Sequence, residues 1–331
     1  MINPIPHIAV IGAGKIGSRH LQGLTSIKRQ IDLTVVEQDS SAMELAKSRY
    51  DEMPVNPLVR SVRYVKSLDE NELDIDVCIV ATNADVRRDV IEALLNRVEV
   101  DYFILEKVVF QSVRDFEFVI RLLERKNTKA WVNCPRRMVP VFRDLREKAI
   151  SRSHGPIMMR VTGSLWGLAS NTIHMLDLLA FVTGRKNITV DASGLDKEIY
   201  ISKRPGYIEL GGRLTAQTEA GDVLELVDNR EAAFPLLMHI ETDEEIFDIN
   251  QTDSLCKLTP RHGPNEPSEW HFNIPAQSAL TGLQVEQILE EGVSSLTSLE
   301  ESFLLHRPML DAFNEHLSSL GNRKITVCPI T

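Results

Sequence analysis

Residues 7–20 read HIAVIGAGKIGSRH, and this stretch decides the fold class of the chain. It has the pattern of an apolar strand, a turn with the spacing G-x-G-x-x-G, and the opening of a helix. Gly12 is expected to make the tight turn, Gly14 to let the backbone approach a pyrophosphate, and Gly17 to let helix and strand pack closely. The stretch therefore predicts a turn that binds a dinucleotide.

The surroundings of this turn support a dinucleotide site. Lys15 and Ile16 stand at the helix start, where unpaired backbone N–H groups and the positive end of the helix dipole attract phosphates. A second predicted strand, residues 31–36, ends at Glu37, twenty residues after Gly17. A carboxylate there accepts hydrogen bonds from the adenosine ribose hydroxyls and repels a 2′-phosphate, so NAD is favoured over NADP. The alternative is a glycine turn in an α/β protein that binds nothing.

The composition is that of an ordinary globular protein, with 43% apolar and 25% charged residues in a chain of 331. This length favours two domains over a single core. The net charge of −10 leaves no basic stripe for a nucleic acid. No apolar stretch suits a membrane span, and the first predicted strand begins too early for a signal peptide. Four scattered cysteines fit reduced thiols in the cytoplasm, and no metal site is expected.

Downstream of the motif, apolar runs alternate with helical patterns as far as residue 133. Strands are predicted at residues 31–36, 62–65, 76–82, 102–105 and 129–133, and helices at 18–28, 40–50, 85–97 and 113–126. This alternation is typical of a doubly wound parallel sheet, a Rossmann domain over residues 1–134. Ligands bind at the carboxyl ends of such strands. Gly12, Glu37, Thr82 and Lys107 all fall at predicted strand ends.

The pattern changes from about residue 135. Helices are predicted at residues 140–150, 171–182, 279–291 and 299–320, a strand at 156–163, and a loop at 261–267. Residues 189–253 alternate apolar and polar at period two, which indicates a meandering antiparallel sheet. The second domain, residues 135–331, is therefore expected to be α+β with an open, largely antiparallel sheet.

Two side chains are candidates for chemistry on a hydroxyl group. A nicotinamide-dependent dehydrogenase needs a group that takes the hydroxyl proton as hydride leaves. Lys107 follows a buried strand and Glu106 at the expected edge of the sheet, and burial can tune its pKa. His174 shares one face of an apolar helix with Ser170, Asn171 and Asp177, so this face is expected to line a cleft. The alternatives are a solvated surface lysine and a satisfied core histidine.

The chain resembles the Gfo/Idh/MocA oxidoreductase family, which includes glucose–fructose oxidoreductase and inositol dehydrogenase. The motifs that carry the resemblance are residues 12–20, Ala81-Thr82-Asn83, Glu106-Lys107, residues 163–184 with His174-x-x-Asp177, and residues 299–308. The resemblance implies a Rossmann domain followed by an α/β domain whose open sheet often builds oligomers, here a dimer or tetramer. It also implies a lysine–histidine active site between the domains and substrates that are mostly sugars, cyclitols or their derivatives.

Site residues follow from the motifs and the resemblance together. Lys107 and His174 are the catalytic candidates. The predicted cofactor-binding residues are Gly12, Gly14, Lys15, Ile16, Gly17, Glu37, Ala81, Thr82, Asn83 and Glu106. The predicted substrate-side residues are Arg136, Trp166, Ser170, Asn171 and Asp177.

The sequence departs from the family pattern at the catalytic motifs. Val108 stands where the family usually has a proline after the lysine, often preceded by a cis bond. Ser170 replaces the common aspartate four residues before the histidine, so Asn171 or Asp177 is expected to take part of its role.

Further departures concern basic side chains. Arg87 replaces a histidine that commonly follows the Ala-Thr strand end. Arg136 or Arg137 lies in a segment that could grip a substrate carboxylate or phosphate. The alternative for this pair is a solvated or interdomain salt bridge.

The sequence thus favours an NAD-dependent oxidoreductase of a sugar or sugar derivative, nucleotide-linked sugars included. Internal recycling of a bound cofactor is a variant of this hypothesis. The alternative is a non-catalytic protein of the same fold that senses dinucleotides or sugars, as the yeast galactose-pathway repressor does. The substrate, the carbon oxidised, the direction and the oligomer size do not follow from the sequence.

Overall fold

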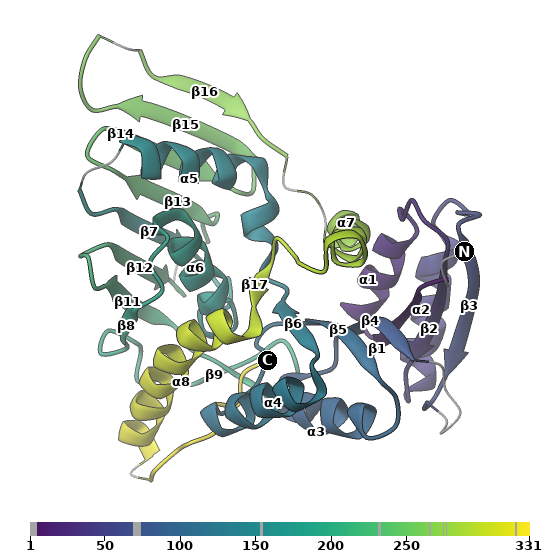
Figure 1. Ribbon diagram of the computed structural model, residues 1–331. Helices are drawn as coiled ribbons and strands as arrows, with labels where there is room; N and C mark the ends of the chain where they lie inside the picture. The colour runs from purple at the N-terminus through teal and green to yellow at the C-terminus, as the bar shows by residue number, and fades with distance from the viewer. Residues whose placement is uncertain are drawn as a thin grey trace. The chain divides into compact units, whose positions relative to one another are not determined.

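The computed structural model describes residues 5–68, 74–152, 155–230, 233–264, 266–273, 275, 277–321 and 323–331. The chain divides into two compact units. The first unit contains Met1–Phe110, Arg114–Pro135 and Pro275–Glu300, and the second contains Gln111–Val113, Arg136–Ile274 and Glu301–Thr331. Figure 1 shows the elements of both units coloured along the chain.

A sheet of seven strands in the order β17-β6-β5-β4-β1-β2-β3 forms the first unit. Every pair in it is parallel except β17 with β6. The strands are β1 His7–Ile11, β2 Ile31–Val36, β3 Val59–Val65, β4 Ile75–Val80, β5 Val100–Leu105, β6 Lys129–Val132 and β17 Thr297–Ser298. The strand order reverses between β1 and β4, which is the predicted doubly wound arrangement.

The helices of the first unit explain why its central strands are continuously apolar. These helices are α1 Gly17–Leu24, α2 Ser40–Asp51, α3 Ala84–Leu95, α4 Val113–Lys126 and α7 Gln277–Glu291. Every residue of β1 is buried, and so are Val77 to Val80 of β4. A parallel strand covered on both faces has no solvent side on which to place polar residues.

Helix α7 belongs to the first unit although it lies late in the sequence. It packs against α1 and contacts β4. The two helices approach closely at small residues, since a Cβ added to Gly282 would lie 2.9 Å from the carbonyl oxygen of Gly23. The sequence placed residues 275–300 in the second domain. The structure assigns them to the first, because α7 covers α1 and β17 extends the parallel sheet.

An eight-stranded sheet in the order β16-β15-β14-β13-β7-β12-β11-β8 forms the second unit. It is antiparallel except for the pair of β7 with β12. This agrees with the largely antiparallel sheet that the sequence predicts. The strands are β7 Met158–Gly163, β8 Ile188–Asp191, β11 Gly212–Thr218, β12 Val223–Asp228, β13 Leu237–Glu241, β14 Glu245–Asn250, β15 Leu255–Pro260 and β16 Ser268–His271. A separate ribbon pairs β9 Tyr200–Ile201 with β10 Ile208–Glu209.

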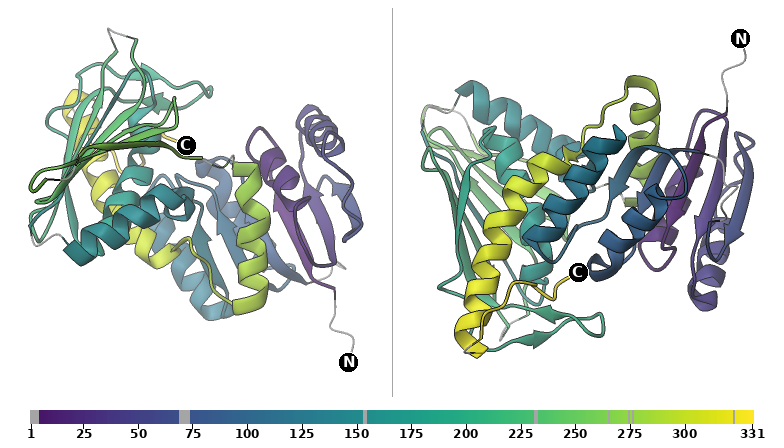
Figure 2. Two further views of the ribbon diagram at one scale, coloured as in Figure 1. Left: turned by 90° about the horizontal axis from the view of Figure 1, so that it is seen from above. Right: turned by 60° about the horizontal axis from the view of Figure 1, so that its bottom comes forward.

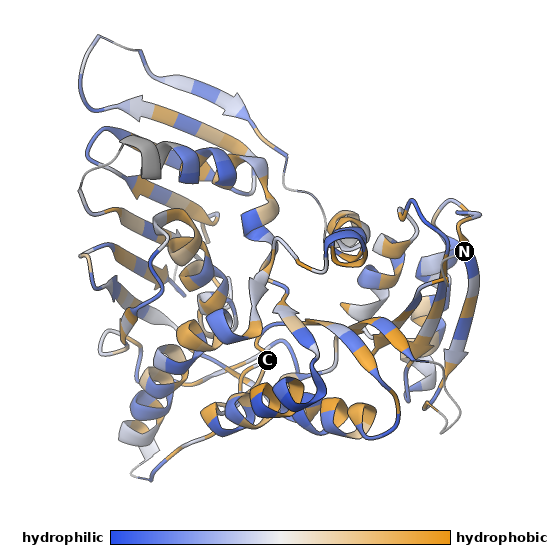
Figure 3. Cartoon of the chain, viewed as in Figure 1, coloured by the Kyte–Doolittle hydropathy of each residue, from blue (hydrophilic) through white to orange (hydrophobic). Residues whose placement is uncertain are grey.

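Helices cover one face of this sheet, as the two views in Figure 2 show. These helices are α5 Pro140–Arg152, α6 Leu168–Thr183 and α8 Leu299–Gly321, and the 3₁₀ turn η1 Pro135–Met138 precedes α5. The covered face carries apolar residues such as Val161, Leu226 and Ile240, which are buried. Polar and apolar residues alternate along β13 to β15 (Figure 3), as in an antiparallel sheet with one solvated face.

The other face of the eight-stranded sheet carries a row of acidic and basic side chains. Neighbouring strands place Glu225, Arg160, His239, Asp248, Lys257 and Glu269 directly opposite one another in register. Arg160 pairs with Glu225, and His239 Nδ1 lies 2.7 Å from Asp248 Oδ1. Opposite charges facing each other across strands stabilise the register.

Element boundaries differ from the predictions by a few residues. Helix α6 begins at Leu168 rather than at residue 171, and β7 begins at Met158 rather than at residue 156. The predicted loop 261–267 joins β15 to β16, a strand that the sequence did not predict. Residue 265 of this loop, and residues 231 and 232 of the predicted meander, lie outside the described residues.

Candidate active site

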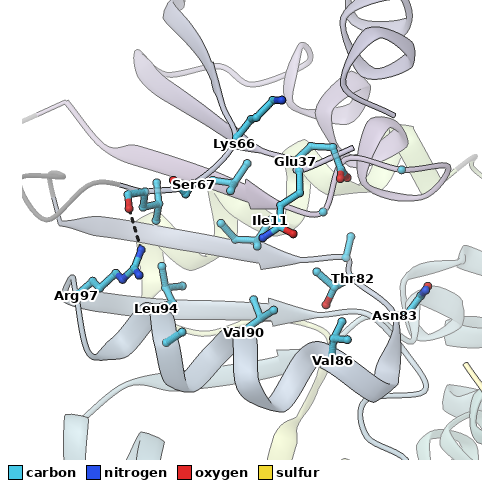
Figure 4. A pocket seen from close by; sticks show the side chains of 17 residues that line it. Ile11, Glu37, Lys66, Ser67, Thr82, Asn83, Val86, Val90, Leu94 and Arg97 are labelled. Carbon is cyan, nitrogen blue, oxygen red and sulfur yellow. Dashed lines mark hydrogen bonds between the residues drawn. The ribbon is translucent and has the colours of Figure 1, made fainter. Parts of the chain in front are cut away.

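The carboxyl ends of β1 and β4 form one wall of a cavity in the first unit. The cavity measures about 660 Å³ and lies where the strand order reverses, which is the usual ligand site of such sheets. It is lined by Ile11, Gly12, Gly14, Val36, Glu37, Gln38, Lys66, Ser67, Leu68, Ala81, Thr82, Asn83, Val86, Val90, Ala93, Leu94 and Arg97. Figure 4 shows Val86, Val90 and Leu94 of α3 facing this space, with Thr82 above them. Its size suits a cofactor site.

Each glycine of the motif has its own neighbours. Gly12 has a φ of +82°, and a Cβ there would lie 2.9 Å from the backbone nitrogen of Thr82. A Cβ on Gly17 would overlap the carbonyl oxygen of Gly12, so this glycine is required for the close packing of α1 on the turn. A Cβ on Gly14 would meet nothing within 4 Å. The space at Gly14 is therefore open to a ligand and is not used by the fold.

Glu37 at the end of β2 holds the glycine turn. Its Oε2 accepts a hydrogen bond of 2.8 Å from the backbone N–H of Ala13, and its Oε1 accepts one of 2.9 Å from Asp39. The carboxylate is half-buried and lines the cavity. Each carboxylate oxygen has a second lone pair, so Glu37 can also accept hydrogen bonds from ribose hydroxyls.

Only some of the predicted cofactor-binding residues line the cavity. Gly12, Gly14, Glu37, Ala81, Thr82 and Asn83 line the cavity. Ile16 precedes the first residue of α1, Gly17 packs against the turn, and Lys15 is exposed, its carbonyl accepting a 3.0 Å hydrogen bond from Arg49. The Thr82 hydroxyl oxygen is buried and has no hydrogen-bond partner within the described part of the chain, which leaves it available to a ligand.

Glu106 is buried in a polar network beneath Lys107. Its Oε1 accepts a 2.6 Å hydrogen bond from Asn133 and lies 2.9 Å from His20 Nε2. Burial alone would raise the pKa of Glu106, but the hydrogen bond and charge of His20, with Asn133 and Lys107, lower it to about 2. The carboxylate that was predicted on the cofactor side therefore binds other side chains of the first unit.

Helix α7 completes this network. His20 Nδ1 lies 2.9 Å from the Thr281 hydroxyl, and Gln284 donates a 3.1 Å hydrogen bond to Asn133. In the sequence, His20 stands out only as the last residue of the motif at residues 12–20. The additional contacts come from a segment about 260 residues away in the sequence, which no local pattern could reveal.

Lys107 follows β5 and is half-buried between the buried residues Glu106 and Val108. The peptide bond between Lys107 and Val108 is cis. The carbonyl groups around it accept hydrogen bonds from Arg87, a fully buried arginine of α3. The sequence distinguished Arg87 only as a departure from the family. Its position on the buried stripe of α3, four residues before Ile91, was the available signal.

In the second unit, His174 lies on α6 and is only 9% exposed. The helix begins after Gly167, whose φ is +76°, and ends at Gly184, whose φ is +73°. Both glycines adopt the left-handed conformation that other residues avoid. The last helical residue, Thr183, lies one residue beyond the predicted end at residue 182, whereas the start lies three residues earlier than expected.

A carboxylate that the sequence did not indicate caps this helix. Glu209 of β10 accepts a 3.0 Å hydrogen bond from the backbone N–H of Ala169 and another from the Ser170 hydroxyl. Negative charge at a helix N-terminus is favourable. Ser170 lies four residues before His174, so Glu209 brings a carboxylate to the first turn of the helix that carries the histidine. The two-residue strand β10 offered no sequence signal for this contact.

Three other predicted substrate-side residues, Asp177, Asn171 and Trp166, make contacts that hold the structure of the second unit. Arg137 forms a two-pronged ion pair with Asp177, with its Nη2 2.8 Å from Oδ1 and its Nε 2.9 Å from Oδ2. Burial raises the pKa of Asp177, and Arg137 and Arg136 oppose this rise. Asp177 thus pairs with Arg137 of η1, within one unit. The interdomain salt bridge, left open as an alternative for this arginine pair, does not describe the ion pair of Arg137 with Asp177, because both lie in the same unit.

Asn171 and Trp166 bind backbone groups. Asn171 donates hydrogen bonds of 2.8 and 3.0 Å to the carbonyl oxygens of Trp166 and Gly167. The Trp166 indole donates one of 3.1 Å to Val227 of β12. These bonds tie the loop before α6 to the helix and to the sheet.

Within the described residues, no group of three or more histidine, cysteine, aspartate and glutamate side chains is arranged to hold a metal ion. All four cysteines are buried, and none of them forms a disulfide within the described residues. None of the helices in the described part of the chain is long and apolar enough to cross a membrane.

The strand order, the glycine turn and the cavity at the switch point define a Rossmann domain of the dinucleotide-binding class. Residues 7–134 match the family model for Gfo/Idh/MocA, described as an oxidoreductase family with an NAD-binding Rossmann fold. This match assigns residues 7–134, the Rossmann domain, to the Gfo/Idh/MocA family. No curated protein sequence matches the chain.

Solved structures share the fold over almost the whole chain. An oxidoreductase from Agrobacterium radiobacter in complex with NAD+, L-tartaric acid and magnesium has 14% identity and a TM-score of 0.69, covering 96% of this chain and 99% of that chain. A UDP-N-acetylglucosamine 3-dehydrogenase from Acidithiobacillus ferrooxidans has 13% identity and a TM-score of 0.66, covering 93% and 97%. A super-repressor mutant of Gal80p from Saccharomyces cerevisiae has 12% identity and a TM-score of 0.70, covering 96% and 97%.

Proposed function

We propose that this chain is an NAD-dependent oxidoreductase that acts on a hydroxyl or carbonyl group of a sugar or sugar derivative, nucleotide-linked sugars included. The observation that carries the proposal is the open space at Gly14 beside a cavity of about 660 Å³ at the switch point. A fold without a ligand has no need for glycine at this position. The uncharged Thr82 hydroxyl and the Glu37 carboxylate supply the polar contacts that a dinucleotide needs.

The residues of the cavity support NAD over NADP. Glu37 stands at the end of β2, where the adenosine ribose binds in this fold, and its charge would repel a 2′-phosphate. The backbone N–H groups around Gly14 and Ile16 would hold the pyrophosphate at the start of α1. NAD held in this way would supply the hydride acceptor. Titration with each cofactor tests this choice, and tighter binding of NADP would contradict it.

Lys107 and His174 are the proposed catalytic residues. Lys107 would bind the substrate oxygen and stabilise negative charge on it, and His174 would exchange the hydroxyl proton as general acid and base. Arg137 holds Asp177, one turn along α6 from His174, and Glu209 caps the start of the same helix. These contacts fix the backbone that carries His174.

The test is an absorbance assay for NADH with a panel of sugars, cyclitols, uronates and nucleotide sugars. We expect turnover with at least one class of substrate. Lys107→Met and His174→Ala should each lower kcat by about 10²-fold or more, because positioned acid–base groups contribute that much. Their NAD affinity should stay close to that of the parent. Lys126→Met, at a surface ion pair with Glu99, and His239→Ala, on the open sheet face, are the matched controls. Parent-like rates in both catalytic variants would exclude this assignment.

The second candidate is a regulatory protein that binds a dinucleotide and a sugar without catalysis. It is favoured by the use of Asp177, Asn171 and Ser170 in hydrogen bonds that hold the second unit together. Tight NAD binding with no turnover across the whole panel would support this candidate over the enzyme.

We also propose that the chain forms a homo-oligomer, a dimer or tetramer. The open face of the eight-stranded sheet carries both carboxylates and basic side chains, so two copies related by a two-fold axis can match opposite charges. Sedimentation analysis that gave the mass of a single chain at low salt would contradict this.

A further inference from the structure

Arg87 is the largest charged side chain that the fold buries completely, with 1% of its surface exposed. A guanidinium group stays protonated at any pH that a protein tolerates. Burying this charge is therefore costly unless hydrogen bonds compensate it. Neighbouring Arg88 provides a contrast, because it lies at the surface with ion pairs to Asp89 and Glu92.

The hydrogen bonds of Arg87 converge on the backbone around Lys107. Its Nη1 donates to the carbonyl oxygens of Glu106, Val108 and Val109 at 2.6, 2.6 and 2.7 Å. Its Nη2 donates to the carbonyl oxygen of Thr82. One guanidinium thus connects the ends of β4 and β5.

These carbonyl groups need a donor from outside the sheet. Strand β5 ends at Leu105, and the chain then leaves the ladder through Val108 and Val109, which are fully buried. A buried carbonyl without a hydrogen-bond donor destabilises the fold. Arg87 donates hydrogen bonds to carbonyl groups on both sides of Lys107. Because its guanidinium is planar and rigid, few other backbone conformations can accept these bonds.

We propose that Arg87 is a positioning residue for Lys107. It fixes the backbone from Glu106 to Val109, and the position from which the Lys107 side chain extends is then fixed as well. Through Thr82 it also ties this backbone to the wall of the dinucleotide cavity. Because Arg87 is buried, we expect it to act through this backbone and not on the substrate directly. The kinetic part of this proposal rests on the proposed function, whereas the structural part does not.

The test compares Arg87→Met, which keeps the length but has no donors, with Arg87→Lys, which keeps the charge and loses the fork. Arg88→Met is the matched control at the adjacent position. Hydrogen exchange followed by mass spectrometry reports on residues 106–110, and acylation of Lys107, read by peptide mass, reports on the lysine. We expect both rates to rise about tenfold or more in Arg87→Met, less in Arg87→Lys and not in the control. Exchange in β1 and β2 should stay near the parent rate.

Kinetics supply the second readout once a substrate is known. Arg87→Met should lose about 10²-fold in kcat, since a displacement of about 1 Å can cost that much, with a much smaller change in KM. In Arg87→Met the basic limb of the pH profile of kcat should also shift, because the surroundings of Lys107 change. Millimolar guanidinium should restore part of the activity to Arg87→Ala.

Each outcome decides the proposal. The proposal is overturned if Arg87→Met exchanges at residues 106–110 and acylates at Lys107 at the parent rates. It is also overturned if these rates rise equally over the whole first unit. If Arg87→Met does not fold, Arg87→Lys and the guanidinium rescue of Arg87→Ala decide by the same measurements. Absence of turnover in the parent would instead contradict the proposed function, and the exchange and acylation rates would still decide whether Arg87 positions Lys107.

Discussion

Gly14 and Gly17 stand three residues apart in one motif, yet the structure gives a different reason for each. At Gly17 the obstacle to a side chain is the carbonyl oxygen of Gly12, which is part of the fold. At Gly14 the structure offers no obstacle within 4 Å. A requirement for glycine at Gly14 must therefore come from a ligand.

This difference predicts opposite behaviour for two alanine variants. Gly17→Ala should lower the free energy of unfolding by about 2–4 kcal/mol or prevent folding, because backbone must move. Gly14→Ala should change it by less than about 1 kcal/mol, while its NAD affinity falls at least tenfold. Urea unfolding and calorimetric titration with NAD measure the two effects. Gly14→Ala that bound NAD as tightly as the parent would contradict the dinucleotide site.

Glu106 predicts how stability depends on pH. Its pKa falls from the ordinary 4.5 to about 2 in the folded chain, so its ionisation stabilises the fold above about pH 4.5. That contribution is lost as the pH falls through 2. A shift of this size corresponds to roughly 3 kcal/mol at neutral pH. Glu106→Gln should therefore be less stable at pH 7 and show a flatter loss of stability between pH 5 and 3.

Urea unfolding at several pH values measures this difference. Glu99→Gln, an exposed glutamate of the same unit, is the control and should follow the parent. An equal pH slope in Glu106→Gln and the parent would show that the network around His20 does not hold a charged carboxylate.

The sequence predicted where site residues lie in the fold better than it predicted which residues they contact. Gly12, Glu37 and Thr82 line one cavity because parallel strands end at one edge of a sheet, and this follows from strand periodicity alone. Asp177 was expected to position His174 or substrate, but it pairs with Arg137, forty residues earlier. The contacts of Glu209 and Arg87 were missed for the same reason, since a contact between distant segments depends on how elements pack.

At the scale of elements, the start of α6 lacks the aspartate that the family commonly has at the position of Ser170, and Glu209 of β10 supplies a carboxylate there instead. Ser170 carries no charge, and Glu209 reaches its hydroxyl and the N–H of Ala169 from β10. Glu209→Gln should destabilise the fold by about 1 kcal/mol, because it removes a charge from the helix N-terminus. Ser170→Asp should also destabilise it, because it places two carboxylates side by side.

The double variant Ser170→Asp with Glu209→Gln should recover most of the lost stability, because one carboxylate then remains at the helix start. A coupling energy of about 1 kcal/mol or more in this double-mutant cycle is expected from urea unfolding. Additive effects of the two changes would mean that Glu209 and Ser170 do not act as one cap.

Periodicity identified most elements, and it failed where pairing is long-range. The region 113–126 was predicted with its observed bounds because α4 has a clear apolar stripe. Strand β16 was missed because it pairs only with β15 at a sheet edge, where half-exposed residues show no alternation. The parallel pair of β7 with β12 inside an antiparallel sheet also has no local signature.

At the scale of the whole molecule, the division into two units does not follow the order of the sequence. All residues that line the dinucleotide cavity belong to the first unit, which also contains Pro275–Glu300. Helix α7 packs on α1, the helix that begins at the glycine turn. Binding at the turn should therefore stabilise a segment that lies more than 250 residues later in the chain.

NAD at about 100 times its Kd should stabilise the first unit by about 2.7 kcal/mol. Hydrogen exchange should slow by up to about 100-fold in peptides of β1, β4 and β5, and also in peptides from residues 279–298. Peptides of β11 to β15 in the second unit serve as the internal control, because none of their residues lines the cavity, and they should exchange at the unliganded rate. If residues 279–298 followed β11 to β15 instead of β1, α7 would belong to the cooperative unit of the second domain. The contiguous boundary at residue 134 would then describe the chain better than the discontinuous one.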